Sequence, residues 1–266
     1  MEQELYLRFK DLIYRESGIN LGSDKKELLN NRVQKRLRKL GIKEPGQYLK
    51  MVETDLSGEE LVELLDVVST NLTFFYREPQ HFELYTRLLK EWYAAGKRSF
   101  RIWCAASSSG EEPYTLAFLA QESIDLKQAD LKILATDIST RVLRKAIEGI
   151  YELKQFEKMP PSLFSTYFKK ANDGENSHYQ VIPEIKRLVS FKRLNLIESP
   201  LPLKGPIDII FCRNVMIYFD VPTRAKIISE FERILRPGGY LMLGHSENLL
   251  GITHALRGRG VATFEK

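Results

Sequence analysis

The chain has 266 residues, of which 43% are hydrophobic and 28% charged, and its formal net charge is +5 at pH 7. This length corresponds to one large domain or two modest ones, and the composition excludes a disordered, collagen-like or low-complexity chain. No apolar run approaches the roughly 20 residues that cross a bilayer, and so weak a positive charge does not by itself indicate a nucleic-acid partner.

The N-terminus and the cysteines indicate the compartment. The first 16 residues are charged throughout and contain no apolar signal core. Cys104 and Cys212 each lie in an apolar, strand-like run, and two such residues do not make a disulfide framework. We therefore expect reduced thiols in a cytoplasmic protein that does not insert into membranes.

The first 75 residues have a helical pattern. Leu5, Phe9 and Leu12 recur on one helical face before a stop at Gly18. Further helices are expected over three ranges: 23–40, 47–53 and 58–68. Residues 1–75 are thus predicted to form an N-terminal helical domain, and residues 76–99 to contain a linking helix.

From residue 100 the pattern changes to short β-branched runs that alternate with helical stretches. The expected strands are 100–105, 131–136, 206–212 and 239–244, and the expected helices are 112–122, 140–148 and 222–235. This alternation predicts an α/β domain over 100–266, with a parallel sheet covered on both faces. The polar stretch 150–187, with a possible hairpin near 179–182, interrupts the pattern and is predicted to be an inserted subdomain.

The loop after the first expected strand is rich in small residues and leads into Glu111 and Glu112. It lacks the glycine fingerprint of dinucleotide-binding loops, and two carboxylates at a helix N-terminus disfavour a phosphate. The loop therefore suits a ligand with a cationic end. The alternative is a tight strand–helix turn capped by Ser109.

Polar residues also follow the later strands, at the edge where open parallel sheets bind ligands. Asp137 ends the second expected strand, where a carboxylate can accept from two vicinal ribose hydroxyls; alternatively it caps the helix near Thr140. Arg213 and Asn214 lie between apolar residues, which suits the lining of a cleft. The alternative for this pair is hydrogen bonding to neighbouring loop backbone.

The segment TNLTFFYRE, residues 70–78, places Asn71, Thr73 and Arg77 among three aromatic residues. Aromatic faces stabilise bound cations, and arginine holds carboxylates through paired hydrogen bonds. The alternative is an aromatic plug between the two domains.

Six segments together resemble the CheR-type chemotaxis protein-glutamate methyltransferases. They are, in chain order, TNLTFFYRE, RIWCAASSSGEEPYTLA, ILATDIS, FKRLNL, DIIFCRNVMIYFD and LRPGGYLMLGHSE. The resemblance covers nearly the whole chain and departs at Ser109, where threonine is common. It implies a class I methyltransferase fold, a Rossmann-like doubly wound sheet with an N-terminal all-helical domain and a small inserted β-subdomain.

The resemblance also implies S-adenosylmethionine as the cofactor and glutamate side chains of chemoreceptor cytoplasmic helices as the substrate. The residues expected to contact the cofactor are Asn71, Thr73, Arg77, Glu112, Asp137, Asn195, Leu196, Cys212 and Arg213. Asp137 is expected on the ribose and Asn195 with Leu196 beside the adenine, while Glu112 is favoured over Glu111. Arg77 and Tyr218 are expected beside the transferring methyl.

A glutamate carboxylate, with a pKa of about 4.3, is already ionised at neutral pH and needs no general base. The four histidines accordingly form no obvious triad or metal spacing, and we expect no metal. The other readings are a cofactor-binding sensor or scaffold without turnover, and a methyltransferase that acts on another substrate.

The second predicted helix carries a cationic stripe of Arg32, Lys35, Arg36 and Lys39. Such a stripe is typical of a solvated helix face, but it would also steer a receptor helix that bears glutamates. No RNA-binding signature accompanies it, so nucleic acid is not expected as a partner. Residues 150–187 are a candidate site for a receptor C-terminal tail, and a monomer is expected.

Overall fold

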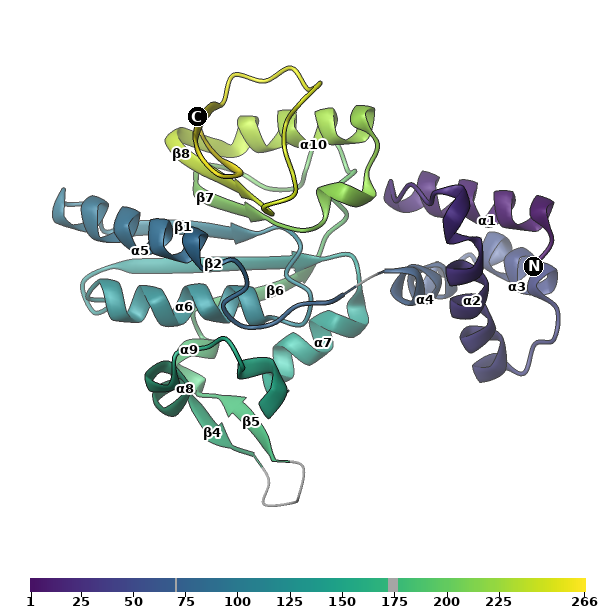
Figure 1. Ribbon diagram of the computed structural model, residues 1–266, viewed down its shortest axis with the longest axis horizontal. Helices are drawn as coiled ribbons and strands as arrows, with labels where there is room; N and C mark the ends of the chain where they lie inside the picture. Colours follow the sequence, from purple (N-terminus) through teal and green to yellow (C-terminus); the bar gives the residue numbers. More distant parts are fainter. Residues whose placement is uncertain (70, 172–176) are drawn as a thin grey trace.

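The computed structural model describes residues 1–69, 71–171 and 177–266. Figure 1 shows two bodies: an all-α domain that contains the N-terminus, and a sheet domain whose central strands point towards it. The expected fold class is confirmed, with a helical N-terminal part, a doubly wound sheet and a small inserted β-subdomain.

The all-α domain is a bundle around its own core. Its elements are α1 (Gln3–Ser17), the 3₁₀ helix η1 (Ser23–Lys25), α2 (Lys26–Leu40), α3 (Pro45–Thr54) and α4 (Glu59–Val68). The helices bury one face each, and Phe9, Val33 and Leu64 are completely inaccessible. α1 ends at Gly18, which takes the left-handed conformation (φ 73°) that closes a helix and donates its N–H to the Tyr14 carbonyl.

The sheet has seven strands in the order β6-β2-β1-β7-β8-β10-β9. Their bounds are β1 (Ser99–Cys104), β2 (Asp130–Asp137), β6 (Val189–Arg193), β7 (Ile207–Cys212), β8 (Leu235–Leu243), β9 (Arg257–Gly260) and β10 (Thr263–Glu265). The first five strands of this order are parallel, and β10 and β9 run antiparallel at one edge. The chain builds from β1 towards β6 and then crosses to β7 on the other side of β1. The loops after β1 and β7 therefore diverge, which creates the crevice where doubly wound folds bind ligands.

Helices cover both faces of this sheet. They are α5 (Pro79–Ala94), α6 (Glu111–Ser123), α7 (Thr140–Glu148) and α10 (Val221–Ile234). Successive strand residues alternate between two cores: Ile102 packs with α5 and α6, whereas Trp103 packs with α10. Because both faces are buried, the central strands read as continuous apolar runs, as in the fully buried β7.

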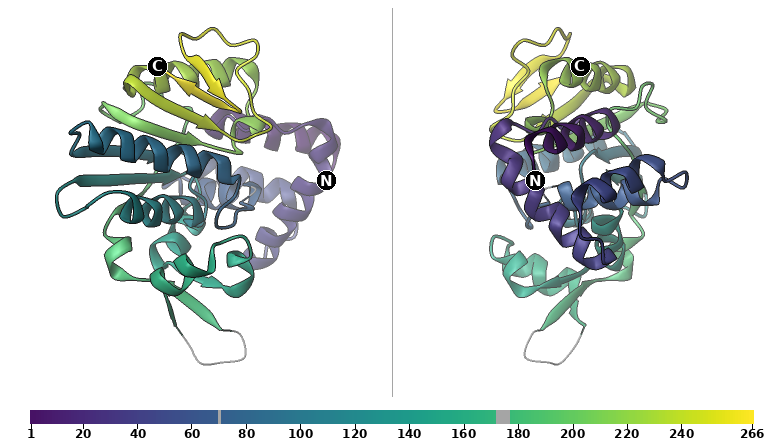
Figure 2. Two further views of the ribbon diagram at one scale, coloured as in Figure 1. Left: turned by 60° about the vertical axis from the view of Figure 1, so that its left-hand side comes forward. Right: turned by 90° about the vertical axis from the view of Figure 1, so that its right-hand side faces the viewer.

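The inserted subdomain lies between α7 and β6 and projects from the sheet domain in both views of Figure 2. Its elements are β3 (Ile150–Glu152), η2 (Leu153–Phe156), α8 (Pro161–Tyr167), β4 (Phe168–Lys170), β5 (His178–Val181) and α9 (Pro183–Lys186). The strands form an antiparallel sheet in the order β3-β5-β4. The predicted hairpin near 179–182 is thus part of a three-stranded sheet, in which β5 is central.

Two features of the sheet differ from expectation. The strand expected at 239–244 begins earlier: β8 starts at Leu235 and runs through Pro237-Gly238-Gly239 as an irregularity, with Gly238 at φ 68° and a register shift opposite β7. The antiparallel β9–β10 pair was not expected, because its strands are short and β9 is an exposed Arg-Gly repeat. Among the described residues, none of the helices combines the length and apolar character needed to cross a bilayer.

Candidate active site

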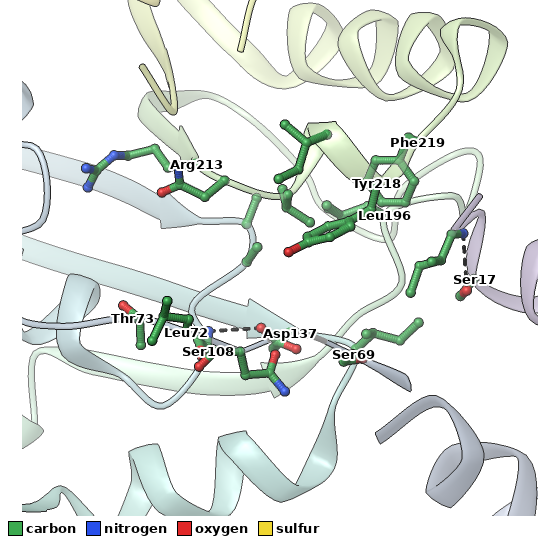
Figure 3. Close-up of a pocket in the computed structure, with 18 of the residues that line it drawn as sticks. Ser17, Ser69, Leu72, Thr73, Ser108, Asp137, Leu196, Arg213, Tyr218 and Phe219 are labelled. Carbon is green, nitrogen blue, oxygen red and sulfur yellow. Dashed lines mark hydrogen bonds between the residues drawn. The ribbon is translucent and has the colours of Figure 1, made fainter. Parts of the chain in front are cut away.

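A cavity of about 530 Å³ opens between the carboxyl ends of the strands and the all-α domain. Figure 3 shows side chains that line it, from the loops after β1, β2 and β7 and from the segment before α5. α2 contributes Leu28 and Arg32 from the opposite side. The cavity is therefore built by both domains.

Asp137 organises the floor of the cavity from the end of β2. Its Oδ2 accepts the Ser108 backbone N–H at 2.9 Å and its Oδ1 accepts the Ser139 backbone N–H at 2.9 Å. Burial raises the pKa of Asp137, against the opposing effect of these two N–H donors. Asp137 does not cap the next helix, because Ser139 occupies that position and accepts from Val142. The carboxylate is thus fixed in orientation while it faces the cavity.

Arg213 joins two carboxylates at the other end. Its Nη1 donates to Glu112 Oε2 at 2.7 Å and its Nη2 donates to Glu78 Oε2 at 3.0 Å, and the guanidinium also contacts the Arg77 carbonyl. Burial raises the pKa of Glu112, opposed by Arg213. Burial also acts to raise the pKa of Glu78, but Arg213 and Asn214 outweigh it, so that the pKa of Glu78 is lowered. Glu112 lines the cavity, whereas Glu78 does not, so Glu112 is the carboxylate at this end that a cationic group can meet.

The adjacent glutamates at the start of α6 face different ways. Glu112 lines the cavity, whereas Glu111 is completely buried behind it. Glu111 accepts from Ser109 Oγ at 2.8 Å and from Gln155 Nε2 of the inserted subdomain at 2.6 Å. Ser109 is not the helix cap, because Gly110 takes that position at φ 99°.

The segment before α5 lines the cavity with its polar residues, but its buried aromatic residue Phe75 does not form the predicted plug between the two domains, because it packs within the sheet domain and the inserted subdomain. Asn71, Thr73 and Arg77 line the cavity. Phe75 points the other way, is completely buried, and packs on Phe156 of the inserted subdomain with ring centroids 5.0 Å apart. The Arg77 guanidinium donates to the Leu72 carbonyl at 2.8 Å, so the segment folds back on itself beside the cavity.

Asn195, Leu196 and Tyr218 complete the wall near the all-α domain. Asn195 Nδ2 donates to the Glu16 carbonyl of α1 at 2.7 Å, which ties this wall to the other domain. The expectation for Cys212 is wrong for its side chain: the thiol is completely buried in the core between β7 and α10 and does not line the cavity. Burial raises the pKa of the Cys212 thiol well above its usual range.

The four residues of the predicted cationic stripe on α2 do not share one exposed surface. Arg36 is only 8% exposed, and its guanidinium is paired with Glu60 at 2.6 Å and Glu63 at 2.8 Å within the bundle. The expectation that Arg36 belongs to an open steering surface is therefore wrong. Lys35 and Lys39 are exposed, and Arg32 donates to the Val68 carbonyl at the cavity wall.

Sequence reasoning missed several residues that line the cavity. They are, among others, Asn20, Lys25, Leu28, Ser107, Ser108 and Ile217. Ser107 and Ser108 lie inside a quoted motif and could have been included. The loop and helix residues near 20–28 belong to the other domain, and no local pattern places them beside the sheet.

A further cluster lies just outside the cavity. Among the described residues, Glu78, His81 and His245 could jointly hold a metal, because their ligand atoms lie within 4.8 Å of one another. Glu78 is already paired with Arg213 at 3.0 Å, and this guanidinium supplies the positive charge that a metal ion would otherwise bring. This argues for a structural polar cluster behind Arg213.

The cavity fits S-adenosylmethionine by the chemistry of its donors and acceptors. Asp137 offers a fixed carboxylate for hydroxyl groups, and Glu112 offers a carboxylate for a cationic end. Asn71 Nδ2 and Ser107 Oγ are buried and have no hydrogen-bond partner among the described residues. Such orphaned buried atoms at a cavity wall call for a polar ligand.

Comparison with known proteins gives a consistent assignment. The family described as CheR methyltransferase, SAM binding domain, matches residues 71–263, and the CheR methyltransferase all-alpha domain matches residues 4–69. A chemotaxis protein methyltransferase of Salmonella typhimurium is 37% identical over 98% of this chain and 90% of its own length. A chemotaxis protein methyltransferase 2 of Pseudomonas aeruginosa is 35% identical over 98% of this chain and 92% of its own length.

These matches cover both domains and nearly the full length of the relatives. The cofactor is S-adenosylmethionine, and the activity is that of a methyltransferase related to chemotaxis. The chain belongs to the CheR methyltransferase family.

Proposed function

We propose that the protein transfers the methyl group of S-adenosylmethionine to glutamate side chains on the cytoplasmic helices of chemoreceptors, giving glutamyl methyl esters. The observation that carries the proposal is that one cavity unites Asp137, the Glu112–Arg213 pair, Arg77 and Tyr218. Among the described residues that line this cavity there is no histidine. Such a site suits a nucleophile that is already ionised.

The cofactor would be held along the edge of the sheet. Asp137 would accept from the ribose hydroxyls, and Asn195 and Leu196 would flank the adenine. Glu112, held by Arg213, would accept from the ammonium group, while Asn71 and Thr73 would contact the cofactor from the segment before α5. Arg213 acts here mainly through Glu112, because its guanidinium is committed to Glu112 and Glu78.

When bound, S-adenosylmethionine would supply an electrophilic methyl on a cationic sulfonium, and S-adenosylhomocysteine, a neutral thioether, would be the product left after transfer. Arg77 and Tyr218 would orient the incoming glutamate carboxylate for in-line attack, and the protein removes no proton. Arg77 is anchored by the Leu72 carbonyl, and a positioned carboxylate needs less reorganisation on reaching the transition state. Because opposite charges neutralise as the bond forms, exclusion of water by the cavity walls favours the reaction.

The rest of the proposal concerns partners and surroundings. The enzyme would act as a monomer in the cytoplasm. The inserted sheet has β3 and β4 as its edge strands, and an extended receptor tail would add to such an edge through backbone hydrogen bonds. A tail held there would raise the local concentration of enzyme near its substrate.

The test is transfer of a radiolabelled methyl from S-adenosylmethionine to a purified chemoreceptor cytoplasmic fragment. Wild type should label the fragment, and mild base should release the label as methanol, because esters hydrolyse under these conditions. Arg77→Ala should lower turnover about 100-fold at saturating substrates. Arg87→Ala, an exposed arginine on α5, is the matched control and should retain activity.

Three results would contradict the proposal. Cofactor binding without any labelling would indicate a sensor or scaffold. Base-stable label would indicate a different acceptor group. Unchanged turnover in Arg77→Ala would remove Arg77 from the reacting centre.

A further inference from the structure

Three exposed apolar side chains surround the cavity. Leu28, Leu72 and Ile217 are 41%, 76% and 56% exposed, and all three line the cavity. They come from three separate elements: α2, the segment before α5, and η3 (Met216–Tyr218). Single exposed leucines are ordinary on protein surfaces, but several gathered at one opening indicate a contact site. We call these three residues the apolar rim.

The rim residues lie outside the buried cores. None of the three side chains is among the buried residues that form the hydrophobic cores of the described part of the chain. The backbone that carries them is nevertheless held in place: the Leu72 carbonyl accepts from Arg77, and the Ile217 N–H donates to Glu247. The apolar side chains are thus presented outwards from fixed positions.

The rim lies next to cationic residues. Leu28 and Arg32 are four residues apart on α2, on one helical face, and both line the cavity. Arg77 lines it beside Leu72, and Figure 3 shows Leu72 across the cavity from Tyr218. A ligand that matches both properties carries a carboxylate with apolar groups on either side of it.

We propose that the apolar rim recognises apolar side chains that flank the acceptor glutamate, on an amphipathic helical segment. On a helix, residues three or four positions before and after the glutamate lie on its own face and would reach the rim as the carboxylate enters the cavity. The rim then selects among exposed glutamates: one surrounded only by polar residues is a poor substrate. This inference rests on the proposed function and specifies its substrate class.

The experiment compares Leu72→Ser and Ile217→Ser with a matched control, Leu56→Ser. Leu56 is a fully exposed leucine of the all-α domain and does not line the cavity. Each rim variant should lower kcat/KM for the receptor fragment about fivefold to tenfold, since each loses most of one apolar contact. The control should stay within twofold of wild type, and all variants should bind S-adenosylhomocysteine as wild type does.

A second arm changes the substrate. Replacing the apolar residues one turn from the acceptor glutamate by serine should lower the rate of the wild-type enzyme. The same replacement should cost much less with Leu72→Ser, because the two changes remove one interaction.

The following outcomes would overturn the proposal that the apolar rim recognises residues flanking the glutamate. Equal kcat/KM in wild type and rim variants, or additive losses in the second arm, would exclude recognition of flanking residues. Weaker S-adenosylhomocysteine binding by Leu72→Ser would assign that side chain to the cofactor. A wild-type protein that binds S-adenosylhomocysteine but methylates no receptor fragment would contradict the proposed function, and the rim with it.

Discussion

Glu111 and Glu112 are adjacent in the sequence, yet their carboxylates face different surroundings. Glu112 pairs with Arg213 at the cavity, and Glu111 is held by Ser109 and Gln155 behind it. Burial raises the pKa of both groups. The family resemblance favoured Glu112, but the loop sequence by itself does not distinguish the two, because the direction in which each points depends on where α6 begins.

The pair supports a paired prediction. Glu112→Gln should weaken S-adenosylhomocysteine binding about tenfold or more, because it removes negative charge from the cavity and a partner from the buried Arg213. Glu111→Gln should leave the affinity within about threefold and change mainly the free energy of unfolding. Titration calorimetry and urea unfolding of both variants would separate the two effects. Equal loss of affinity in both variants would contradict the assignment of Glu112 to the ligand.

His81 on α5 gives a prediction about pH. Burial lowers its pKa from an ordinary value of 6.5 to about 4, assisted by Arg213. The groups that face it are Glu78, 3.7 Å away, the ring of His245, and the Val261 carbonyl at 3.3 Å. Because the folded-state pKa is the lower one, unfolding takes up a proton between pH 6.5 and 4. His81 therefore contributes stability that is fully present above about pH 6.5 and is lost as the pH falls towards 4.

The expected size of this loss is about 2 kcal/mol between pH 7 and pH 5. Buried carboxylates with raised pKa values change the free energy of unfolding in the opposite direction as the pH falls. The contribution of His81 is therefore measured as the difference between wild type and His81→Gln. The free energy of unfolding of His81→Gln should fall about 2 kcal/mol less than that of wild type over this range. Urea denaturation at several pH values measures it, and parallel curves for the two proteins would contradict the prediction.

At the scale of elements, long periodic segments were predicted well. The predicted helix at 140–148 has the same bounds as α7, and the helices at 112–122 and 222–235 differ from α6 and α10 by one residue at each end. The amphipathic pattern of α7 and α10 is local and can be read from the sequence, whereas α6 buries residues on nearly all of its sides. β3, β4, β9 and β10 have three or four residues each, and so short a strand is defined by its pairing partner more than by its own sequence.

The α2 helix shows how a charge pattern misleads when burial is unknown. Arg32, Lys35, Arg36 and Lys39 follow helical spacing, but Arg36 turns inward to Glu60 and Glu63. The opposing carboxylates lie on α4, more than 20 residues away, and no pattern within α2 reveals them. What remains of the steering hypothesis rests on Lys35 and Lys39, with Arg32 at the cavity.

The exposed lysines and the buried Arg36 of α2 should give different phenotypes: substitution of the lysines should affect activity, and substitution of Arg36 should affect stability. The double variant Lys35→Glu/Lys39→Glu should lower kcat/KM for the receptor fragment about tenfold at low salt, and the loss should shrink at high salt. Lys90→Glu, an exposed lysine on α5, is its control. Arg36→Ala should instead destabilise the protein by about 3 kcal/mol, because it leaves Glu60 without its buried partner. A salt-independent loss in the double variant would exclude steering.

At the scale of the whole molecule, the site is made where two domains meet. The sequence located Asp137, Glu112 and Arg213 from a general property of parallel sheets, because ligands bind beyond the carboxyl ends of the strands. It could not place Lys25 or Leu28 there, since their position depends on how the all-α domain sits against the sheet. Family resemblance supplied Asn195 and Leu196, whose loop has no distinctive pattern of its own.

The contact between the domains is specific. Buried Asp66 of α4 accepts from Thr140 Oγ1 at 3.0 Å and from the Arg141 N–H at 3.2 Å, at the start of α7. On the other side of the cavity, Asn195 Nδ2 donates to the Glu16 carbonyl of α1. These contacts hold the α2 residues against a cavity whose floor belongs to the sheet domain.

The most direct test of the account is a calorimetric titration of S-adenosylhomocysteine into wild type and Asp137→Ala. The account predicts one site per chain in wild type and at least tenfold weaker binding in the variant, because a buried carboxylate that faces the ligand's hydroxyls is lost. Thermal unfolding of the variant without ligand would show that it is folded. Equal affinity in both proteins would place the cofactor elsewhere, and absence of binding to wild type would contradict the central claim that this cavity holds it.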